Sequence, residues 1–93
     1  MPKIDIERKH GKESIEDVKV DVQSLADKLS ARFNLKCRWS GNNLEFKRRG
    51  ANGRIEVDTK RVRLVMNLSI LLAPIKGEIE KRTNMYMDEY FEK

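Results

Sequence analysis

Apolar and charged residues alternate over the first ten positions of the chain. Ile4 and Ile6 are apolar, and the residues beside them are charged. A period of two is typical of a half-buried β-strand. We therefore expect a first strand over residues 2–10, ended by Gly11.

The following segment has a helical period. Ser14 and Asp17 resemble a capping box, which marks the start of a helix. An apolar stripe with spacings of three and four residues follows. It consists of Ile15, Val18, Val22, Leu25, Leu29 and Phe33. We predict an amphipathic helix of about 19 residues that stops at Asn34, a residue type that tolerates the left-handed conformation of a helix end.

Four short alternating runs come next, separated by turn residues. Their apolar positions fall in residues 35–39, 44–47, 54–58 and 62–68. The turns are expected at residues 41–43, 50–53 and 59–60. Short strands with tight connections pair as antiparallel neighbours, because parallel pairing needs longer crossovers.

A second helix is predicted from Pro74 onward, since proline suits the first turn of a helix. Its stripe consists of Ile75, Ile79, Thr83, Tyr86 and Tyr90. The predicted order is β-α-β-β-β-β-α. Two amphipathic helices can cover the apolar face of one sheet. We therefore predict an α+β two-layer sandwich, a reduced helix-grip-like arrangement, in which a five-stranded and largely antiparallel sheet carries both helices on one face.

The length of 93 residues leaves room for one modest core, so we expect residues 1–93 to form a single domain. The longest uncharged stretch, residues 64–75, is shorter than the roughly 20 residues of a membrane-spanning helix. No transmembrane segment is expected. A basic and then apolar start is missing as well, which predicts no secretory signal and a cytoplasmic location.

Charge adds a candidate surface. The chain carries 20 Lys and Arg against 15 Asp and Glu, a net charge of +5. Strand alternation assigns most of this excess to the sheet face that points away from the helices. The bases on that face are Lys3, Lys9, Lys36, Arg38, Lys47, Arg49, Arg54, Arg61 and Arg63. The acids are Asp5, Glu7, Glu45, Glu56 and Asp58.

An electropositive face can attract nucleic acid, anionic lipid or an acidic partner. The candidate residues for such binding are Lys36, Arg38, Lys47, Arg61 and Arg63. Charges paired across neighbouring strands are also an ordinary way to keep a sheet soluble. Trp39 and Phe46 alternate in step with the core positions of their strands, so we expect them to point inward. The outward face then lacks the aromatic side chains on which proteins that bind single-stranded nucleic acid stack bases. Nucleic acid is therefore disfavoured, and weak, salt-sensitive phosphate contact remains open.

Little in the sequence suggests catalysis. Cys37 has inward alternation and is expected to be a buried, inert thiol. His10 is the single histidine, so a metal site is not expected. Gly50 and Gly53 match the GxxG of a KH loop, but strand patterns flank them and favour a hairpin turn. We expect no catalytic residues, no metal and no cofactor, and hence not an enzyme.

Two apolar features stand out, the junction over residues 68–75 and the C-terminal tail. In the tail, Met85, Met87 and Phe91 widen the helical stripe. Either they pack on the first helix or under the sheet edge, or they form a dimer seam or a surface for an apolar partner, where methionine adapts well. These three residues are the candidate apolar partner surface.

Six segments of the chain form a distinctive set. They are residues 1–12, 31–33, 38–41, 44–48, 53–57 and 71–80. Together they resemble the polyhydroxyalkanoic acid system proteins, small bacterial proteins of about this length, over nearly the whole chain. The resemblance implies a link to polyhydroxyalkanoate storage granules. It offers no catalytic residue that could be transferred to this sequence.

Three functional hypotheses follow. The first is a non-enzymatic accessory or binding protein that meets the granule surface or granule proteins, with a homodimer compatible with the sequence. The second is a module that binds anionic surfaces, nucleic acid or acidic lipid, through the basic sheet face. The third is a small carrier that holds an acyl chain in a cavity between sheet and helices.

Overall fold

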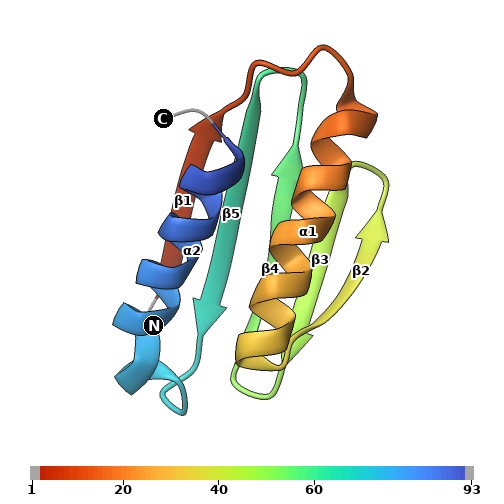
Figure 1. Ribbon diagram of the computed structural model, residues 1–93. Helices are drawn as coiled ribbons and strands as arrows, with labels where there is room; N and C mark the ends of the chain where they lie inside the picture. The colour runs from red at the N-terminus through yellow and green to blue at the C-terminus, as the bar shows by residue number, and fades with distance from the viewer. Residues whose placement is uncertain (1–2, 92–93) are drawn as a thin grey trace.

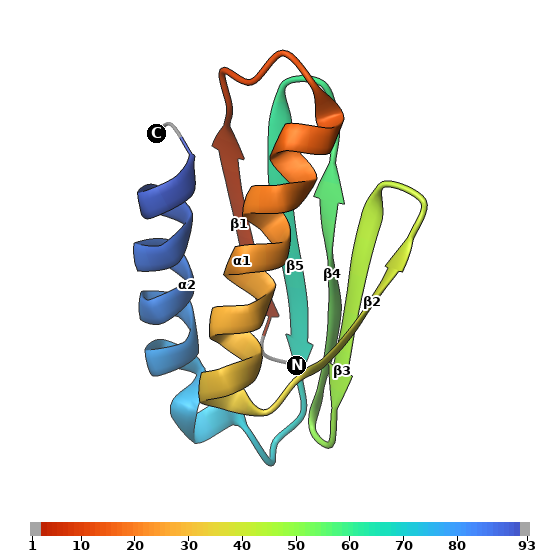
Figure 2. The ribbon, with the colours of Figure 1, turned by 45° about the vertical axis from the view of Figure 1, so that its right-hand side comes forward.

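A single antiparallel sheet and two helices make up the structure, a computed structural model that describes residues 3–91 (Figure 1). The strands are β1 (Lys3–Lys9), β2 (Lys36–Ser40), β3 (Asn43–Arg48), β4 (Ala51–Val57) and β5 (Arg61–Leu68). The helices are α1 (Ile15–Phe33) and α2 (Lys76–Tyr90), the latter preceded by a 3₁₀ turn, η1 (Ala73–Ile75). Both helices lie on the same face of the sheet (Figure 2). The predicted α+β two-layer arrangement is confirmed, while Pro2, the expected first strand residue, lies outside the described residues.

The sheet order is β1-β5-β4-β3-β2, and every pairing is antiparallel. Strands β2 to β5 form a meander joined by short turns, as their alternation predicted. The chain crosses from β1 through α1 to the far edge, so β1 pairs with β5, the last strand to be made. The sheet therefore has β1 and β2 as its two edges (Figure 1).

Helix α1 begins and ends where the sequence predicted. The hydroxyl of Ser14 accepts a hydrogen bond from the backbone N–H of Glu16, which satisfies one of the free donors of the first turn. Asn34 adopts the left-handed conformation with φ 58°, and its N–H donates to the carbonyl of Ser30.

The core lies between the sheet and the helices. The largest side chains that are fully buried come from both layers: Ile4, Leu25, Leu29, Leu44, Ile55, Leu64, Met66, Leu68, Ile79 and Met87. Two inward residues of the edge strand β2 are only half-buried, Cys37 and Trp39. The indole N–H of Trp39 donates to Oε1 of Gln23 on α1, 2.8 Å away. The expectation of a buried Cys37 was therefore wrong, because α1 covers the edge strand incompletely.

The turn expected over residues 50–53 is shorter than predicted, since β4 already begins at Ala51. Gly50, with φ 90°, makes the turn. Gly53 lies inside the strand opposite Phe46. A Cβ atom at Gly53 would overlap the carbonyl oxygen of Val65 and lie 2.9 Å from Cζ of Phe46, so here glycine provides space for a close approach.

Helix α2 begins at Lys76 and not at Pro74 as expected, because residues 73–75 form the 3₁₀ turn η1. Ile75, which opened the predicted stripe, is exposed. Ile79 and Thr83 of that stripe are buried as predicted, and Met87 completes the buried face. Tyr86 and Tyr90 are partly buried against the core. The hydroxyl of the buried Thr83 has a hydrogen-bond partner, because it donates to the carbonyl of Ile79 at 2.7 Å.

Candidate functional site

The face of the sheet opposite the helices is open, and strand register arranges its side chains in rows that cross the sheet. One row runs Arg38, Glu45, Arg54, Val65 and Asp5 from β2 to β1. The neighbouring row on the side of the β4–β5 turn contains Glu56, Arg63 and Glu7. These rows contain both signs of charge.

Ion pairs neutralise most of this charge. The guanidinium of Arg63 donates to both carboxylate oxygens of Asp5 at 2.9 and 2.6 Å. These hydrogen bonds lower the pKa of the Asp5 carboxyl below its ordinary value and raise the pKa of Arg63. Arg54 pairs with Glu56. Val65, which alternation places on this outward face, is nevertheless only 4 % exposed, because its neighbours in register, Arg54 and Asp5, are long or ion-paired side chains.

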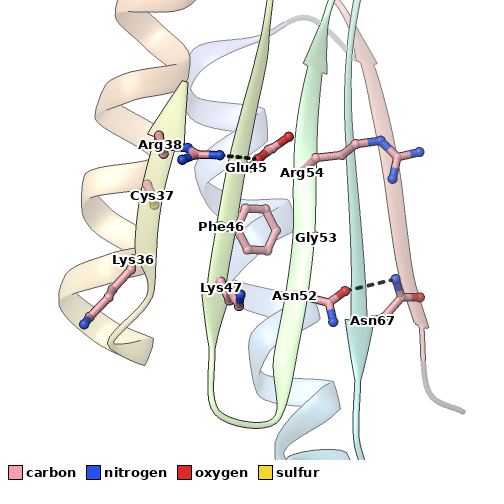
Figure 3. Close-up of a pocket in the computed structure, with 10 residues that line it drawn as sticks. All are labelled: Lys36, Cys37, Arg38, Glu45, Phe46, Lys47, Asn52, Gly53, Arg54 and Asn67. Carbon is pink, nitrogen blue, oxygen red and sulfur yellow. Dashed lines mark hydrogen bonds and ion pairs between the residues drawn. The ribbon is translucent and has the colours of Figure 1, made fainter. Parts of the chain in front are cut away.

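The row on the other side of the Arg38 row, next to the β3–β4 turn, differs because it contains no acid. It runs Lys36, Lys47, Asn52, Asn67 and Lys3 from β2 to β1, and we call it the lysine row. Within residues 3–91, neither Lys36 nor Lys47 has a carboxylate oxygen within 4.0 Å. The two amides contact each other, with Nδ2 of Asn67 3.5 Å from Oδ1 of Asn52 (Figure 3).

A shallow hollow of about 630 Å³ lies between the lysine row and the row of Arg38 (Figure 3). Its side-chain walls are Lys36, Arg38, Glu45, Lys47, Asn52, Arg54 and Asn67. Its floor contains Gly53, whose lack of a side chain lets the β4 backbone lie close to β5. Bases outnumber acids in this wall, and the amides add hydrogen-bond donors, so the hollow is suited to an anionic group.

The five basic residues named from the sequence therefore divide into two groups. Arg63 is held by Asp5, and Arg61 lies 3.3 Å from Glu7. Arg38 lies 3.6 Å from Glu45, but its side chain is 83 % exposed, which leaves it free to turn toward a ligand. Lys36 and Lys47 stand together in register without an acid beside them.

The predicted apolar surface on the tail is corrected by the burial of its residues. Met87 is fully buried and Phe91 is 5 % exposed, so both belong to the core. The reason is that α2 turns the face of Ile79, Thr83 and Met87 inward. Met85 alone is exposed, at 50 %. The packing alternative of the sequence analysis is the correct one for Met87 and Phe91.

Two adjacent exposed aliphatic residues lie instead in the loop after β5. Ile70 is 88 % exposed and Leu71 is 54 % exposed, whereas Leu72 beside them is buried. The sequence identified the aliphatic junction but not which residues face outward. A loop has no period from which sidedness can be deduced, so only the structure separates the exposed pair from the buried residue.

This loop is held in place by hydrogen bonds. The N–H of Ser69 donates to the carbonyl of Gly50 at 2.8 Å, which fastens the loop to the β3–β4 turn. The N–H of Leu71 donates to the hydroxyl of Ser69, and those of Leu72 and Ala73 donate to its carbonyl. The exposure of Ile70 and Leu71 is thus built into an ordered turn.

Groups suited to catalysis are dispersed. The Cys37 thiol lies 3.2 Å from the Ser30 hydroxyl, and it makes no hydrogen bond to a histidine in the part of the chain that the structure describes. His10 contacts the carbonyl of Asp58 through Nε2 at 2.8 Å. Within residues 3–91, no three His, Cys, Asp or Glu side chains come together as metal ligands. None of the helices in that range is both long and apolar enough to cross a bilayer.

Comparison with curated proteins and with solved structures gives no match. A family model matches residues 4–91, which span all the strands and both helices apart from the first residue of β1. The matched range contains Lys36 and Lys47 of the lysine row and the loop of Ile70 and Leu71, and it confirms the family resemblance seen in the sequence. By this match over nearly its whole length, the chain belongs to the family described as putative polyhydroxyalkanoic acid system proteins.

Proposed function

We propose that this chain is a non-enzymatic binding protein of the polyhydroxyalkanoate system that attaches to the surface of storage granules. The family gives the link to the polymer system. The observation that carries the proposal is the exposure of Ile70 and Leu71 on a hydrogen-bonded turn. A soluble domain seldom presents neighbouring aliphatic side chains on a fixed loop unless they meet an apolar partner.

The mode of action is attachment by a surface. The space between sheet and helices is filled by fully buried side chains, among them Leu25, Leu44 and Leu64. An acyl chain would have to displace them, which gives the carrier hypothesis no support. A polyester particle presents an extended apolar surface instead, and a protruding pair such as Ile70 and Leu71 can bury area on it. In a cell, the protein would then reside in the cytoplasm and at the granule.

Sedimentation with purified polyhydroxyalkanoate particles, stripped of lipid and protein, tests this proposal. The wild-type chain should sediment with the particles, and the Ile70→Ser/Leu71→Ser variant should stay largely in the supernatant. Val20→Ser is the matched control, because Val20 is 65 % exposed in the N-terminal half of α1, whereas the loop lies at the end of the molecule where α1 ends (Figure 1). Wild-type protein that stays in solution, or equal loss by the Val20 variant, would contradict the proposal. A pull-down from granule-forming cells would show whether a granule protein is bound instead.

A further inference from the structure

The exposed aliphatic pair and the lysine row lie at the same end of the molecule. We call it the hairpin end, because the β3–β4 turn around Gly50 is located there (Figure 1). A Cβ placed on Gly50 would lie 3.2 Å from Cδ2 of Leu71, so the loop rests directly on this turn. Lys47 is three residues before Gly50, and Arg49 is exposed in the turn itself. The two features therefore form one continuous surface.

A second hollow lies between the lysine row and the start of the loop that carries Ile70 and Leu71. It has a volume of about 240 Å³ and is lined by Lys47, Asn52 and Asn67 of the lysine row together with Gly50 and Ser69. The three row residues also line the larger hollow beside Arg38. A continuous run of donors and cations thus extends from β2 across the sheet to Ser69, the residue before Ile70.

The acidic side chains near the hairpin end are ion-paired with other side chains. Glu78 and Glu80, in the first turns of α2, pair with Arg32 and Lys76 at 3.3 and 3.5 Å. Glu45 and Asp5, the acids of the neighbouring row, pair with Arg38 and Arg63. The cations of the lysine row and Arg49 therefore dominate the field around the exposed pair.

We propose that the hairpin end docks onto an anionic phospholipid surface. Ile70 and Leu71 enter the boundary between headgroups and acyl chains, and Lys36, Lys47 and Arg49 bind lipid phosphates around them. Apolar insertion beside basic side chains is the combination that holds a protein at an anionic membrane interface. Lysine side chains suit this role, since their apolar stems can lie along the surface while the ammonium groups reach outward.

The same observations favour lipid over nucleic acid. A nucleic acid bound to this end would contact the lysine row and leave Ile70 in water. The outward face of residues 3–91 also presents no aromatic side chain for base stacking. Lipid accounts for both the charge and the apolar pair. The inference refines the proposed granule attachment by naming anionic phospholipid as the surface that this end recognises, and it rests on that function only for its cellular setting.

Co-sedimentation with phosphatidylglycerol–phosphatidylcholine vesicles tests the inference, with pure phosphatidylcholine vesicles for comparison. We expect partitioning onto the anionic vesicles to fall steeply with salt. The Lys36→Gln/Lys47→Gln variant should lose about fivefold in partitioning per lysine. The Ile70→Ser/Leu71→Ser variant should lose about tenfold or more.

Matched controls come from elsewhere on the surface. Lys9→Gln/Lys60→Gln removes two exposed positive charges at the opposite end of the sheet, and Val20→Ser removes an exposed aliphatic side chain from α1. Both should partition like the wild type. Circular dichroism and the fluorescence of Trp39 would verify that every variant is folded.

Several results would overturn the inference. Equal partitioning onto both kinds of vesicle, equal loss by control and test variants, or no vesicle binding at all would each do so. Binding to single-stranded or duplex DNA that depends on Lys36 and Lys47 but not on Ile70 would assign the surface to nucleic acid instead. Stripped polymer particles separate the two proposals: binding to particles without vesicle binding retains granule attachment and removes lipid docking, and the converse result retains lipid docking alone.

Discussion

Lys36 and Lys47 face each other in register across β2 and β3 on the open side of the sheet. Like charges directly opposite one another destabilise a strand pair. Lys47→Glu creates an opposite-charge pair and should raise the free energy of unfolding by about 0.2–1 kcal/mol, measured by urea denaturation. The same variant should lose anionic-vesicle binding. Lys47→Gln should lie between wild type and Lys47→Glu in stability, and an unchanged stability in both variants would show that the two ammonium groups do not repel each other appreciably.

Gly53 provides a test of the packing between β4 and β5. Gly53→Ala should lower the free energy of unfolding by about 1–3 kcal/mol, because its Cβ would overlap the Val65 carbonyl oxygen and crowd Phe46. Gly77→Ala is the control, since no atom lies within 4 Å of a Cβ placed there. In helix α2 that change should stabilise, by about 0.5–1 kcal/mol at most. Denaturation curves in which both variants shift in the same direction would contradict this account of Gly53.

The two methionines of the tail should differ in their contribution to stability. Met87 is fully buried, so Met87→Ala should cost about 2–5 kcal/mol of unfolding free energy. Met85 is half exposed, and Met85→Ala should change stability by about 0.5 kcal/mol or less. Thermal or urea unfolding measures both. Similar losses from the two variants would mean that α2 presents a different face to the core.

Asp58 should make the stability depend on acid pH. Its Oδ1 accepts hydrogen bonds from the N–H groups of Lys60 and Arg61 at 2.7 and 2.6 Å, and these bonds lower the pKa of the Asp58 carboxyl below 3.8. The charged form is thus favoured by folding. Its stabilising contribution is complete above the unfolded pKa of about 4 and disappears as pH falls through the folded value.

Wild-type protein should therefore exceed Asp58→Asn in unfolding free energy at neutral pH, and the difference should shrink below about pH 4. Urea unfolding across this range measures it. Glu13→Gln, a change at another exposed acid, provides the control for general charge effects. A difference that remains constant with pH would show that the turn does not depend on the ionised Asp58.

Sequence periodicity was sufficient to predict the helices and strands, because each of them has one buried face. The stripe from Val18 to Phe33 and the stop at Asn34 place α1 correctly. The alternation gives a wrong prediction where something other than the inward or outward direction of the side chain determines the residue type or its burial. Gly53 was expected in a turn, yet glycine is needed there to let β4 approach β5. Val65 lies on the outward face of β5, yet the ion-paired side chains around it cover it.

The candidate site was predictable only in part. Alternation placed Lys36, Lys47 and Arg63 on the same face, and that is where they lie. Which cations keep a free charge depends on register: Asp5, the partner of Arg63, is 58 residues away in the chain. The exposed pair was not predictable, because no pattern of a loop distinguishes Ile70 from its buried neighbour Leu72.

The pairing of β1 with β5 has a consequence for synthesis on the ribosome. The first strand emerges early, but its hydrogen-bonding partners, residues 61–67, emerge much later. Meanwhile β2, β3 and β4 can already associate through their short turns, whereas β1 must wait with Ile4 and Ile6 exposed. The charged residues between these two isoleucines and around them thus also keep the nascent chain from associating with its neighbours before β5 arrives.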